Sequence, residues 1–350
     1  MPLFGLGREK RSVGLDIGSG VLKLAVVDHG KDTPQLEQVA LRPLPGSAIV
    51  EGEVVDPGLV ADTIRDLFAE VDLETEHLVI SVGGRDVIIK LIRMDRMDAS
   101  DAREVIRWEA EQHVPFDMDN VQLDFQITDP EGEGLQMKVL LVAAKRELVD
   151  NKLALVREAG LEPRIVDVDA FGLYNALQVN YPEAMQGICG LVNIGHDTTT
   201  VNILDHGVPV LTRDLSFGTR RLTQDLQRER GLTGEEAERV LRGEGDEGEL
   251  TGFLSERAQE VARGVDRASA FLESQEVGEG MSQLFLCGGG VAVPGLPDAL
   301  AEQMGLETRV ASAVEGIQVK PDVVGSLESD LEHVGPMLML ATGLALRRPA

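Results

Sequence analysis

The chain has 350 residues, of which 33 are basic and 60 are acidic, so its formal net charge is -27. This charge argues against binding of nucleic acid or of an anionic membrane, because both draw on clustered Lys and Arg. The N-terminus lacks a signal-peptide core and no apolar run approaches the ~20 residues that cross a bilayer, so we expect a cytoplasmic protein without direct membrane insertion. Cys189 and Cys287 have no zinc-site spacing and are expected to be small buried residues in a reducing compartment.

The first motif is the stretch Val13 to Asp28, which reads VGLDIGSGVLKLAVVD. The pattern predicts two strands joined by a tight turn at Gly18 to Gly20. Two glycines and a hydroxyl at a hairpin tip leave backbone N–H groups accessible to an anionic phosphate tail. Asp16 before the tip could hold Mg²⁺ and Lys23 after it could neutralise phosphate oxygens, although an ordinary hairpin has the same pattern.

The segment from about residue 46 to 151 is predicted to be a small α+β insert that interrupts the first half of the chain. Pro43 to Gly58 is rich in Pro and Gly and marks the boundary. Trp108 is the only tryptophan and is expected to pack within a helix of this insert. The elements predicted between the hairpin and residue 144 are strands at 35–41, 78–82, 86–93, 121–127 and 138–144, and helices at about 60–71 and 100–113.

The second half of the chain repeats the first hairpin. Leu191 to Asp205 (LVNIGHDTTTVNILD) overlays the first motif at a fixed offset of 177 residues, with Asn193 in the place of Asp16 and Gly195 in the place of Gly18. Internal similarity of this kind indicates two related halves. Each half offers one hairpin tip, and two facing tips would form a clamp for phosphates between two domains.

Other elements surround this second hairpin. The acidic stretch Gly243 to Gly252 is predicted to be a solvated loop before a long amphipathic helix. The run Gly288 to Gly290 ends a strand and precedes a helix, where glycines let the backbone approach a flat ligand closely. The remaining predicted elements are helices at 145–158, 169–179 and 336–346 and strands at 164–168 and 208–215.

The spacing of Asp16, Gly18, Gly20 and Lys23 resembles the first phosphate loop of the ATPase superfamily that contains actin, Hsp70 and sugar kinases, and Gly195 to Thr200 resembles the second. The resemblance implies an α/β fold, namely a two-domain actin-like ATPase fold with a small α+β insert of the FtsA type in the first half. Its expected divisions are a first subdomain at 12–45, 152–186 and 334–347, the insert at 46–151, and a second half at 187–333.

The same resemblance implies a site for ATP and Mg²⁺ between the halves, with Asp16 and Asn193 on the metal. The superfamily usually has aspartate where this chain has Asn193, and loss of that charge leads us to expect slow or absent ATP hydrolysis. Asp167 and Asp169 are the expected catalytic residues, although Asp169 could also be a helix N-cap. The expected cofactor-binding residues are Asp16, Gly18, Ser19, Gly20, Lys23, Asn193, Gly195, Asp197, Thr198, Thr199, Gly218, Glu235, Arg239, Gly288, Gly289 and Gly290.

Three further stretches resemble the PilM family of type IV pilus assembly proteins: VIRWEAEQHVPFDMDNVQLDFQI (105–127), VLLVAAKRELVD (139–150) and AGLEPRIVDVDAFGLYNAL (159–177). This resemblance implies a scaffold recruited to the inner face of the inner membrane. It would capture the cytoplasmic N-terminal peptide of a PilN-like membrane protein in a groove between the insert and the first half. Alternatives are a scaffold of a type II secretion or competence system, an FtsA-like filament-forming protein that self-associates, and a kinase with an unrecognised substrate motif.

Overall fold

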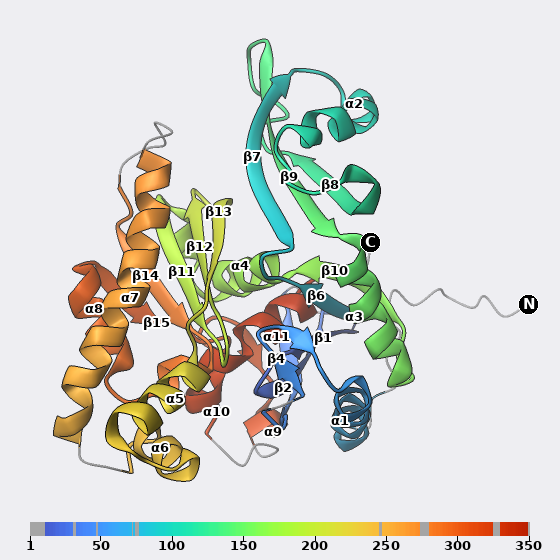
Figure 1. Ribbon diagram of the computed structural model, residues 1–350. Helices are drawn as coiled ribbons and strands as arrows, with labels where there is room; N and C mark the ends of the chain where they lie inside the picture. The colour runs from blue at the N-terminus through green and yellow to red at the C-terminus, as the bar shows by residue number, and fades with distance from the viewer. Residues whose placement is uncertain are drawn as a thin grey trace, which may run out of the picture.

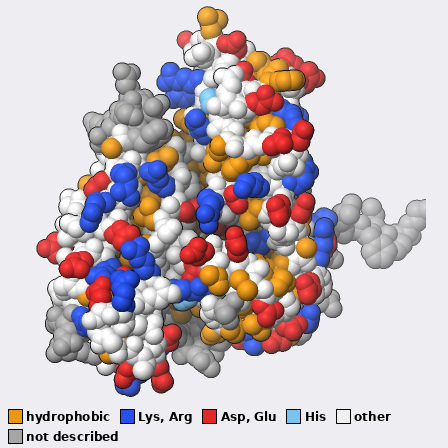
Figure 2. All heavy atoms as spheres, in the orientation of Figure 1, with side chains coloured by type: hydrophobic (Ala, Val, Ile, Leu, Met, Phe, Trp, Pro, Cys, Tyr) orange, Lys and Arg blue, Asp and Glu red, His pale blue; other side chains and the backbone are white. Residues whose placement is uncertain are grey.

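The computed structural model describes residues 11–30, 33–46, 48–71, 73, 77–244, 247–273, 280–324 and 330–348. Two β-sheets with their helices form two halves side by side, and a smaller unit stands above the first half (Figure 1). Acidic and basic side chains are intermixed over the face shown in Figure 2.

The first half is built on a six-stranded sheet of order β10-β6-β1-β2-β3-β16. Its strands are nearly fully buried along β1, β2 and β6, which explains their almost unbroken apolar sequences. Asp56 caps helix α1 (Pro57–Glu70) by accepting the Leu59 N–H at 3.0 Å, and α1 packs on this sheet with α3 (Arg146–Glu158). The strands are β1 (Arg11–Ile17), β2 (Val21–Asp28), β3 (Gln35–Pro43), β6 (Leu78–Val82), β10 (Pro163–Val168) and β16 (Gln318–Val319). A short hairpin, β4 (Ile49–Val50) and β5 (Glu53–Val54), precedes α1.

The second half carries a five-stranded sheet of order β13-β12-β11-β14-β15. This order reproduces β3-β2-β1-β6-β10 of the first sheet, so the sequence repeat is also a repeat of topology. The two hairpins have the same register, because Asp16 pairs with Lys23 and Asn193 pairs with Thr200. The strands are β11 (Ile188–Ile194), β12 (Thr199–Asp205), β13 (Val208–Leu215), β14 (Gln283–Cys287) and β15 (Glu307–Val310).

Helices α4 (Asp169–Asn180) and α11 (Met339–Ala345) lie between the two sheets, and residues from both halves share their core. The helices cross at backbone distance: a Cβ on Gly343 would lie 1.7 Å from the Gly172 carbonyl oxygen. A Cβ on Gly14 of β1 would lie 2.0 Å from the Ala341 carbonyl oxygen. Glycine is therefore required at both contacts, which fix α11 against α4 and the first sheet.

The smaller unit is a three-stranded sheet of order β7-β9-β8 with helix α2 packed on one face and a core of its own. Its elements are β7 (Val87–Asp95), α2 (Ala99–Glu111), the 3₁₀ turn η1 (Met118–Asn120), β8 (Val121–Ile127) and β9 (Gln136–Lys145). The strict alternation expected at 121–127 is seen in the burial of β8. Trp108 is 70% exposed, so the expectation that it packs within the insert is wrong.

Three elements lie outside the divisions expected from the sequence. β6 is a strand of the first sheet and α1 packs on that sheet, although the sequence placed both in the insert at 46–151. β16 pairs with β3 of the first sheet, although the sequence placed it in the half at 187–333. The placement of β6 and β16 depends on parallel pairing between strands that are distant in the chain, which short-range patterns do not report.

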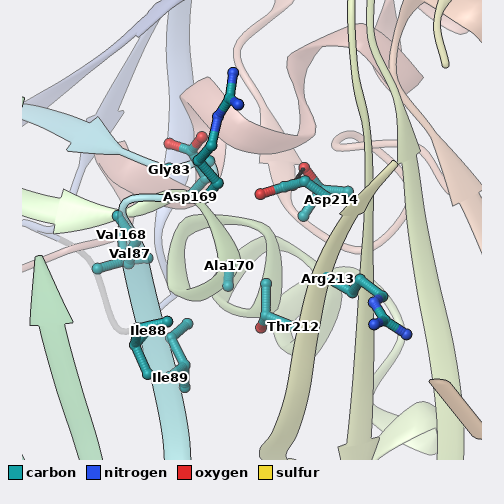
Figure 3. Close-up of a pocket in the computed structure, with 13 residues that line it drawn as sticks. Gly83, Val87, Ile88, Ile89, Val168, Asp169, Ala170, Thr212, Arg213 and Asp214 are labelled. Carbon is teal, nitrogen blue, oxygen red and sulfur yellow. Dashed lines mark hydrogen bonds between the residues drawn. The ribbon is translucent and has the colours of Figure 1, made fainter. Parts of the chain in front are cut away.

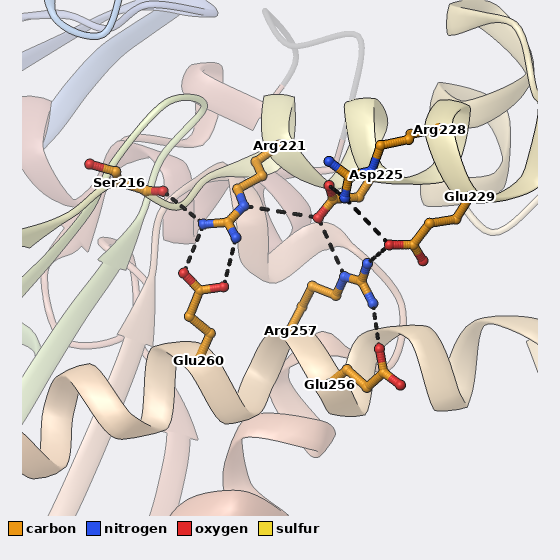
Figure 4. A network of polar contacts seen from close by, with 8 residues as sticks. All are labelled: Ser216, Arg221, Asp225, Arg228, Glu229, Glu256, Arg257 and Glu260. Atoms are coloured by element: carbon orange, nitrogen blue, oxygen red, sulfur yellow. Dashed lines mark hydrogen bonds and ion pairs between the residues drawn. The ribbon is translucent and has the colours of Figure 1, made fainter.

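The second half is covered by α5 (Thr219–Arg230), α6 (Gly234–Leu241), α7 (Glu247–Glu273) and α8 (Leu296–Met304). α7 begins at Glu247, so the expected loop at 243–252 is wrong over its last six residues; acidic residues favour a helix N-terminus. Between α5 and α7, Arg257 lies against three carboxylates, those of Asp225, Glu229 and Glu256 (Figure 4). The remaining short elements are η2 (Pro182–Met185), η3 (Gly289–Ala292), α9 (Pro321–Val324), α10 (Leu331–Val334) and η4 (Gly335–Leu338).

Candidate functional site

The first hairpin tip lies over a buried ion pair. Asp16 and Lys23 face each other across β1 and β2, and Lys23 Nζ lies 2.8 Å from Asp16 Oδ2. Asp16 is only 8% exposed. A Cβ on Gly18 would lie 2.9 Å from Lys23 Nζ, so glycine at this position leaves room for the lysine under the tip. The first tip, with half-buried Ser19 at its centre, therefore lies next to both a lysine ammonium group and a carboxylate.

The second tip meets the first. The Gly195 N–H donates to the Thr198 carbonyl oxygen at 2.9 Å and closes the turn. A Cβ on Gly20 of the first tip would lie 2.9 Å from His196 Cγ of the second. Burial lowers the pKa of His196, so the imidazole is neutral at pH 7. The two repeated tips are thus in contact across the cleft.

The triple glycine lies directly against the second hairpin. Gly288 has φ +88°, and a Cβ there would lie 2.4 Å from Asn193 Oδ1. A Cβ on Gly290 would lie 2.2 Å from Ile194 Cγ2, whereas the nearest atom to one on Gly289 is Met337 Cε at 3.7 Å. Two of the three glycines are therefore required for packing between β11 and η3, and Gly289 is the one with space beside it.

Asp197 of the second tip is engaged by protein groups. Its Oδ1 lies 3.0 Å from Arg220 Nε, and its Oδ2 accepts the Glu51 N–H at 2.8 Å. Arg220 also donates to the carbonyl oxygens of Gly46 at 2.6 Å and Ile49 at 3.1 Å. We call this contact of Asp197 and Arg220 with Gly46, Ile49 and Glu51 the clasp. It joins the second tip to the β4–β5 hairpin of the first half.

The other residues expected at the cofactor occupy two separate places. Thr199 is fully buried and donates to the Phe217 carbonyl oxygen at 2.9 Å, while Thr198 is exposed at the tip. Gly218 begins α5 beneath the second tip, where a Cβ would lie 2.3 Å from the His196 carbonyl oxygen. Glu235 and Arg239 are exposed on α6, and Arg239 pairs with Glu244 at 2.8 Å.

Asp169 projects toward the end of β6. Ser81 Oγ donates to its Oδ1 at 2.5 Å, and a Cβ on Gly83 would lie 2.1 Å from its Oδ2. Val168 is the N-cap of α4 and Asp169 is its first residue, so the alternative of Asp169 as the N-cap is wrong. Burial raises the pKa of Asp169 to about 6. A carboxyl group with this pKa is mostly ionised at pH 7 and can accept a proton.

Asp167 has a different environment, although it is only two residues away. Its Oδ2 lies 3.3 Å from Arg347 Nε near the C-terminus, and its Oδ1 accepts the Val168 N–H at 2.8 Å. Burial raises the pKa of Asp167, and Arg347 opposes that effect. The structure thus brings Asp167 to the C-terminal segment and Asp169 to the cleft.

A cavity of about 260 Å³ lies between the halves, beside Asp169 (Figure 3). Its walls are the β6–β7 turn and β7, the start of α4, and strands β12 and β13. Thr200 and Asp214 line it from the second half, and Thr200 Oγ1 donates to Asp214 Oδ1 at 2.7 Å. Sequence reasoning missed Asp214. It included Thr200 in the second phosphate loop but not among the cofactor-binding residues, although Thr200 is the counterpart of Lys23 at the same 177-residue offset.

Lys152 of α3 is another basic residue near this cleft that sequence reasoning missed. It is half-buried, and burial lowers the pKa of its ammonium group, while the charges of Asp169 and Asp16 oppose that effect. Its only sequence signal is a lysine within an amphipathic helix, which ordinarily means an exposed residue. The cleft therefore has two lysines, Lys23 and Lys152, next to its carboxylates.

These residues fit a magnesium nucleotide better than a metal ion alone. Within the described ranges, no group of three or more His, Cys, Asp or Glu side chains could hold a metal. Mg²⁺, however, is usually bound through one or two carboxylates together with substrate phosphates and waters. Asp16 and Asp169 can supply such carboxylates, and Lys23 with the N–H groups of the glycine tips can bind phosphate oxygens.

Comparisons with known proteins agree with this fold. The chain is 30% identical to a protein in a PilM-PilN type IV pilus biogenesis complex, with a TM-score of 0.81 over 97% of this chain and 98% of that one. It is 12% identical to MreB5 of Spiroplasma citri bound to AMPPNP, with a TM-score of 0.53 over 96% and 95% of the two chains. It is 23% identical to the cell division protein FtsA of Bacillus subtilis, over 86% of this chain and 78% of FtsA.

The expected fold class is confirmed: the protein has a two-domain actin-like fold with a small α+β insert. Among the described helices, none combines the length and the apolar composition that crossing a bilayer requires. The family model for the type IV pilus assembly protein PilM matches residues 14–349. With the repeated hairpin tips, the insert and this match over nearly the whole length, the chain belongs to the PilM family of type IV pilus assembly proteins.

Proposed function

We propose that the protein is an ATP-binding scaffold of the type IV pilus assembly platform that captures the N-terminal peptide of a PilN-like membrane protein. The observation that carries the nucleotide part is the contact between the two repeated tips above the Asp16–Lys23 pair. The partner is supported by the relative that was solved as a PilM-PilN complex, at 30% identity over nearly all of both chains. Such a partner would recruit the protein from the cytoplasm to the inner membrane.

In this proposal ATP lies across the cleft with its phosphates against the two tips. Lys23 and the N–H groups around Gly18 to Gly20 would bind phosphate oxygens, and Asp16 would orient Mg²⁺ through water. The bound cation would supply charge neutralisation of the phosphates. Asp169, which is mostly ionised at pH 7, would orient a water molecule. Asn193 adds no charge to the metal, so turnover is expected to be slow or absent.

The partner peptide is proposed to bind where the insert meets the first half. A groove of about 860 Å³ lies there, between Pro115, Phe116 and Asn120 of the insert and Arg146, Asp150 and Asn151 of α3. Lys145 also lines it, with Nζ 5.0 Å from the centre of the Phe116 ring and 2.7 Å from Asp86 Oδ1. An aromatic ring between charged rims suits a short peptide that carries both apolar and polar side chains.

Nucleotide binding is tested with Asp16→Ala and Asp205→Ala, a matched control at the far end of the second hairpin. Fluorescent ATP with Mg²⁺ should bind wild type and the control with equal affinity and should lose binding to Asp16→Ala. Far-UV circular dichroism verifies that both variants are folded. Equal affinity of Asp16→Ala and wild type would refute the nucleotide assignment.

Peptide capture is tested by fluorescence anisotropy with a labelled peptide that copies the cytoplasmic N-terminus of the PilN-like partner. Phe116→Ala should weaken binding at least ~30-fold, because truncating an aromatic anchor costs about 2 kcal/mol or more. Trp108→Ala is the control, since Trp108 is an exposed aromatic of the same insert outside the groove. Binding that is unchanged in Phe116→Ala would place the peptide elsewhere.

An FtsA-like filament is the second proposal, and the similarity to the Bacillus subtilis protein favours it. ATP-dependent sedimentation of the purified protein would support filament formation. A protein that binds the labelled peptide and stays in the supernatant with and without ATP would support the scaffold alone.

A further inference from the structure

A row of polar side chains crosses the second sheet beside the cleft. Asn193, Thr200 and Asp214 are register partners on β11, β12 and β13, so their side chains lie on one face of the sheet. The corresponding row of the first sheet is Asp16, Lys23 and Leu41. The carboxylate that the second half lacks at Asn193 is therefore present two strands away, at Asp214.

Asp214 faces Asp169 across the cavity between the halves (Figure 3). Asp169 comes from α4 of the first half and Asp214 from β13 of the second. The Thr200 hydroxyl, 2.7 Å from Asp214 Oδ1, orients the Asp214 carboxylate. Arg213 lines the same cavity but directs its guanidinium group away from the two carboxylates in Figure 3.

The same wall contains polar groups that have no protein partner. Asn202 is 1% exposed and pairs in register with Thr212, which lines the cavity. Among the residues that the structure describes, Asn202 Oδ1, Asn202 Nδ2 and Thr212 Oγ1 have no hydrogen-bond partner. Buried polar groups almost always have one, from protein or from ordered water. The wall is therefore suited to a hydrated occupant, and an apolar one would leave these groups unsatisfied.

We propose that Asp214 is a cation-binding residue of the nucleotide site, and that with Asp169 it holds a hydrated divalent cation against the phosphates. The inference rests on the proposed ATP binding and names the carboxylate that replaces the charge lost at Asn193. The chemistry fits Mg²⁺, which keeps several waters and takes one or two carboxylates together with phosphate oxygens. Because the two carboxylates belong to different halves, the cation would join the halves across the cleft.

The test measures Mn²⁺ binding to the full chain by electron paramagnetic resonance, with saturating AMPPNP. Asp214→Asn should raise the dissociation constant for Mn²⁺ at least ~10-fold, a loss of about 1.4 kcal/mol. Its affinity for AMPPNP in EDTA should be at least that of wild type, because without the cation the Asp214 carboxylate can only repel the phosphates. Asp205→Asn, an aspartate of the same sheet at the far end of β12, should bind Mn²⁺ like wild type.

The outcomes separate this inference from the proposed function. If Asp214→Asn binds AMPPNP and Mn²⁺ as tightly as wild type, the role of Asp214 is refuted and ATP binding stands. If wild type binds no nucleotide with Mn²⁺ or in EDTA, both proposals fail. If Asp214→Asn does not fold, Thr200→Val is measured instead. Loss of the hydroxyl that orients Asp214 should weaken Mn²⁺ binding by less than the factor expected for Asp214→Asn. Unchanged Mn²⁺ binding in Thr200→Val would refute the inference.

Discussion

Replacement of Gly343 by alanine should destabilise the protein, although alanine is normally the better helix former. The new Cβ would lie 1.7 Å from the Gly172 carbonyl oxygen and 3.2 Å from the Ala176 nitrogen. An ordinary contact needs about 3.5 Å, so α11 and α4 would have to separate by about 2 Å. Both helices are buried between the two sheets and have no free direction in which to move.

The expected net loss is about 2 kcal/mol of the free energy of unfolding. Overpacking in a core costs up to about 3 kcal/mol, and a backbone contact belongs at the upper end of that range because no rotamer change relieves it. The higher helix propensity of alanine offsets about 1 kcal/mol of this loss. Gly252→Ala is the matched control: Gly252 is an exposed position of α7 with nothing within 4 Å of an added Cβ, and its variant should gain up to about 1 kcal/mol.

Urea unfolding followed by far-UV circular dichroism measures both variants. Fluorescence is unsuitable for this purpose, because the only tryptophan, Trp108, is 70% exposed in the insert and reports little of the helix crossing. Opposite shifts are expected for the same Gly→Ala change at the two positions. Equal stability of Gly343→Ala and wild type would refute the close crossing of α4 and α11.

Three further predictions concern the ion network, the thiols and one histidine. Arg257→Met should lower the free energy of unfolding in urea by about 3 kcal/mol, because buried Asp225 loses one of its positively charged partners. The control is Arg263→Met at an exposed position of the same helix, which should change the free energy of unfolding little. Burial raises the pKa of Cys189 to about 11 and that of Cys287 further, so neither thiol should react with a disulfide reagent at pH 8 until urea unfolds the chain. Burial lowers the pKa of His29 below 6.5, so the unfolded chain binds the proton more readily, and stability should fall as the pH drops through 6.5; His29→Gln should reduce that slope, and an unchanged slope would contradict the assignment.

The hairpin tips and the repeat could be predicted from the sequence because both depend on short-range information. Adjacent antiparallel strands fix the Asp16–Lys23 pair by register alone, and the copy at 193–200 follows from the fixed offset. β6 could not be placed in this way. A buried strand of the first sheet is as apolar as a buried strand of an insert. Only the parallel pairing of β6 with β1 and β10 identifies it as part of the first sheet.

In the candidate site, too, only the features that depend on short-range sequence information could be predicted. Asp167 and Asp169 appear equivalent in the sequence, but the chain changes from strand to helix between them, so one contacts Arg347 and the other reaches Ser81. Asp214 has no glycine motif beside it, and its relation to Asn193 arises from the register of three strands. Its role stays a prediction, as do the roles of the residues in the tips.

The clasp has a consequence for the rate of ligand exchange. Arg220 contacts Asp197 and the carbonyl oxygens of Gly46 and Ile49, and Asp197 also accepts the Glu51 N–H. All of these contacts to the β4–β5 segment must break before the second tip can separate from the first half. A ligand held in the cleft behind the clasp would then leave no faster than the clasp opens, however weak its own contacts are. Residence time in the cleft would be set by Arg220, a residue that need not touch the ligand.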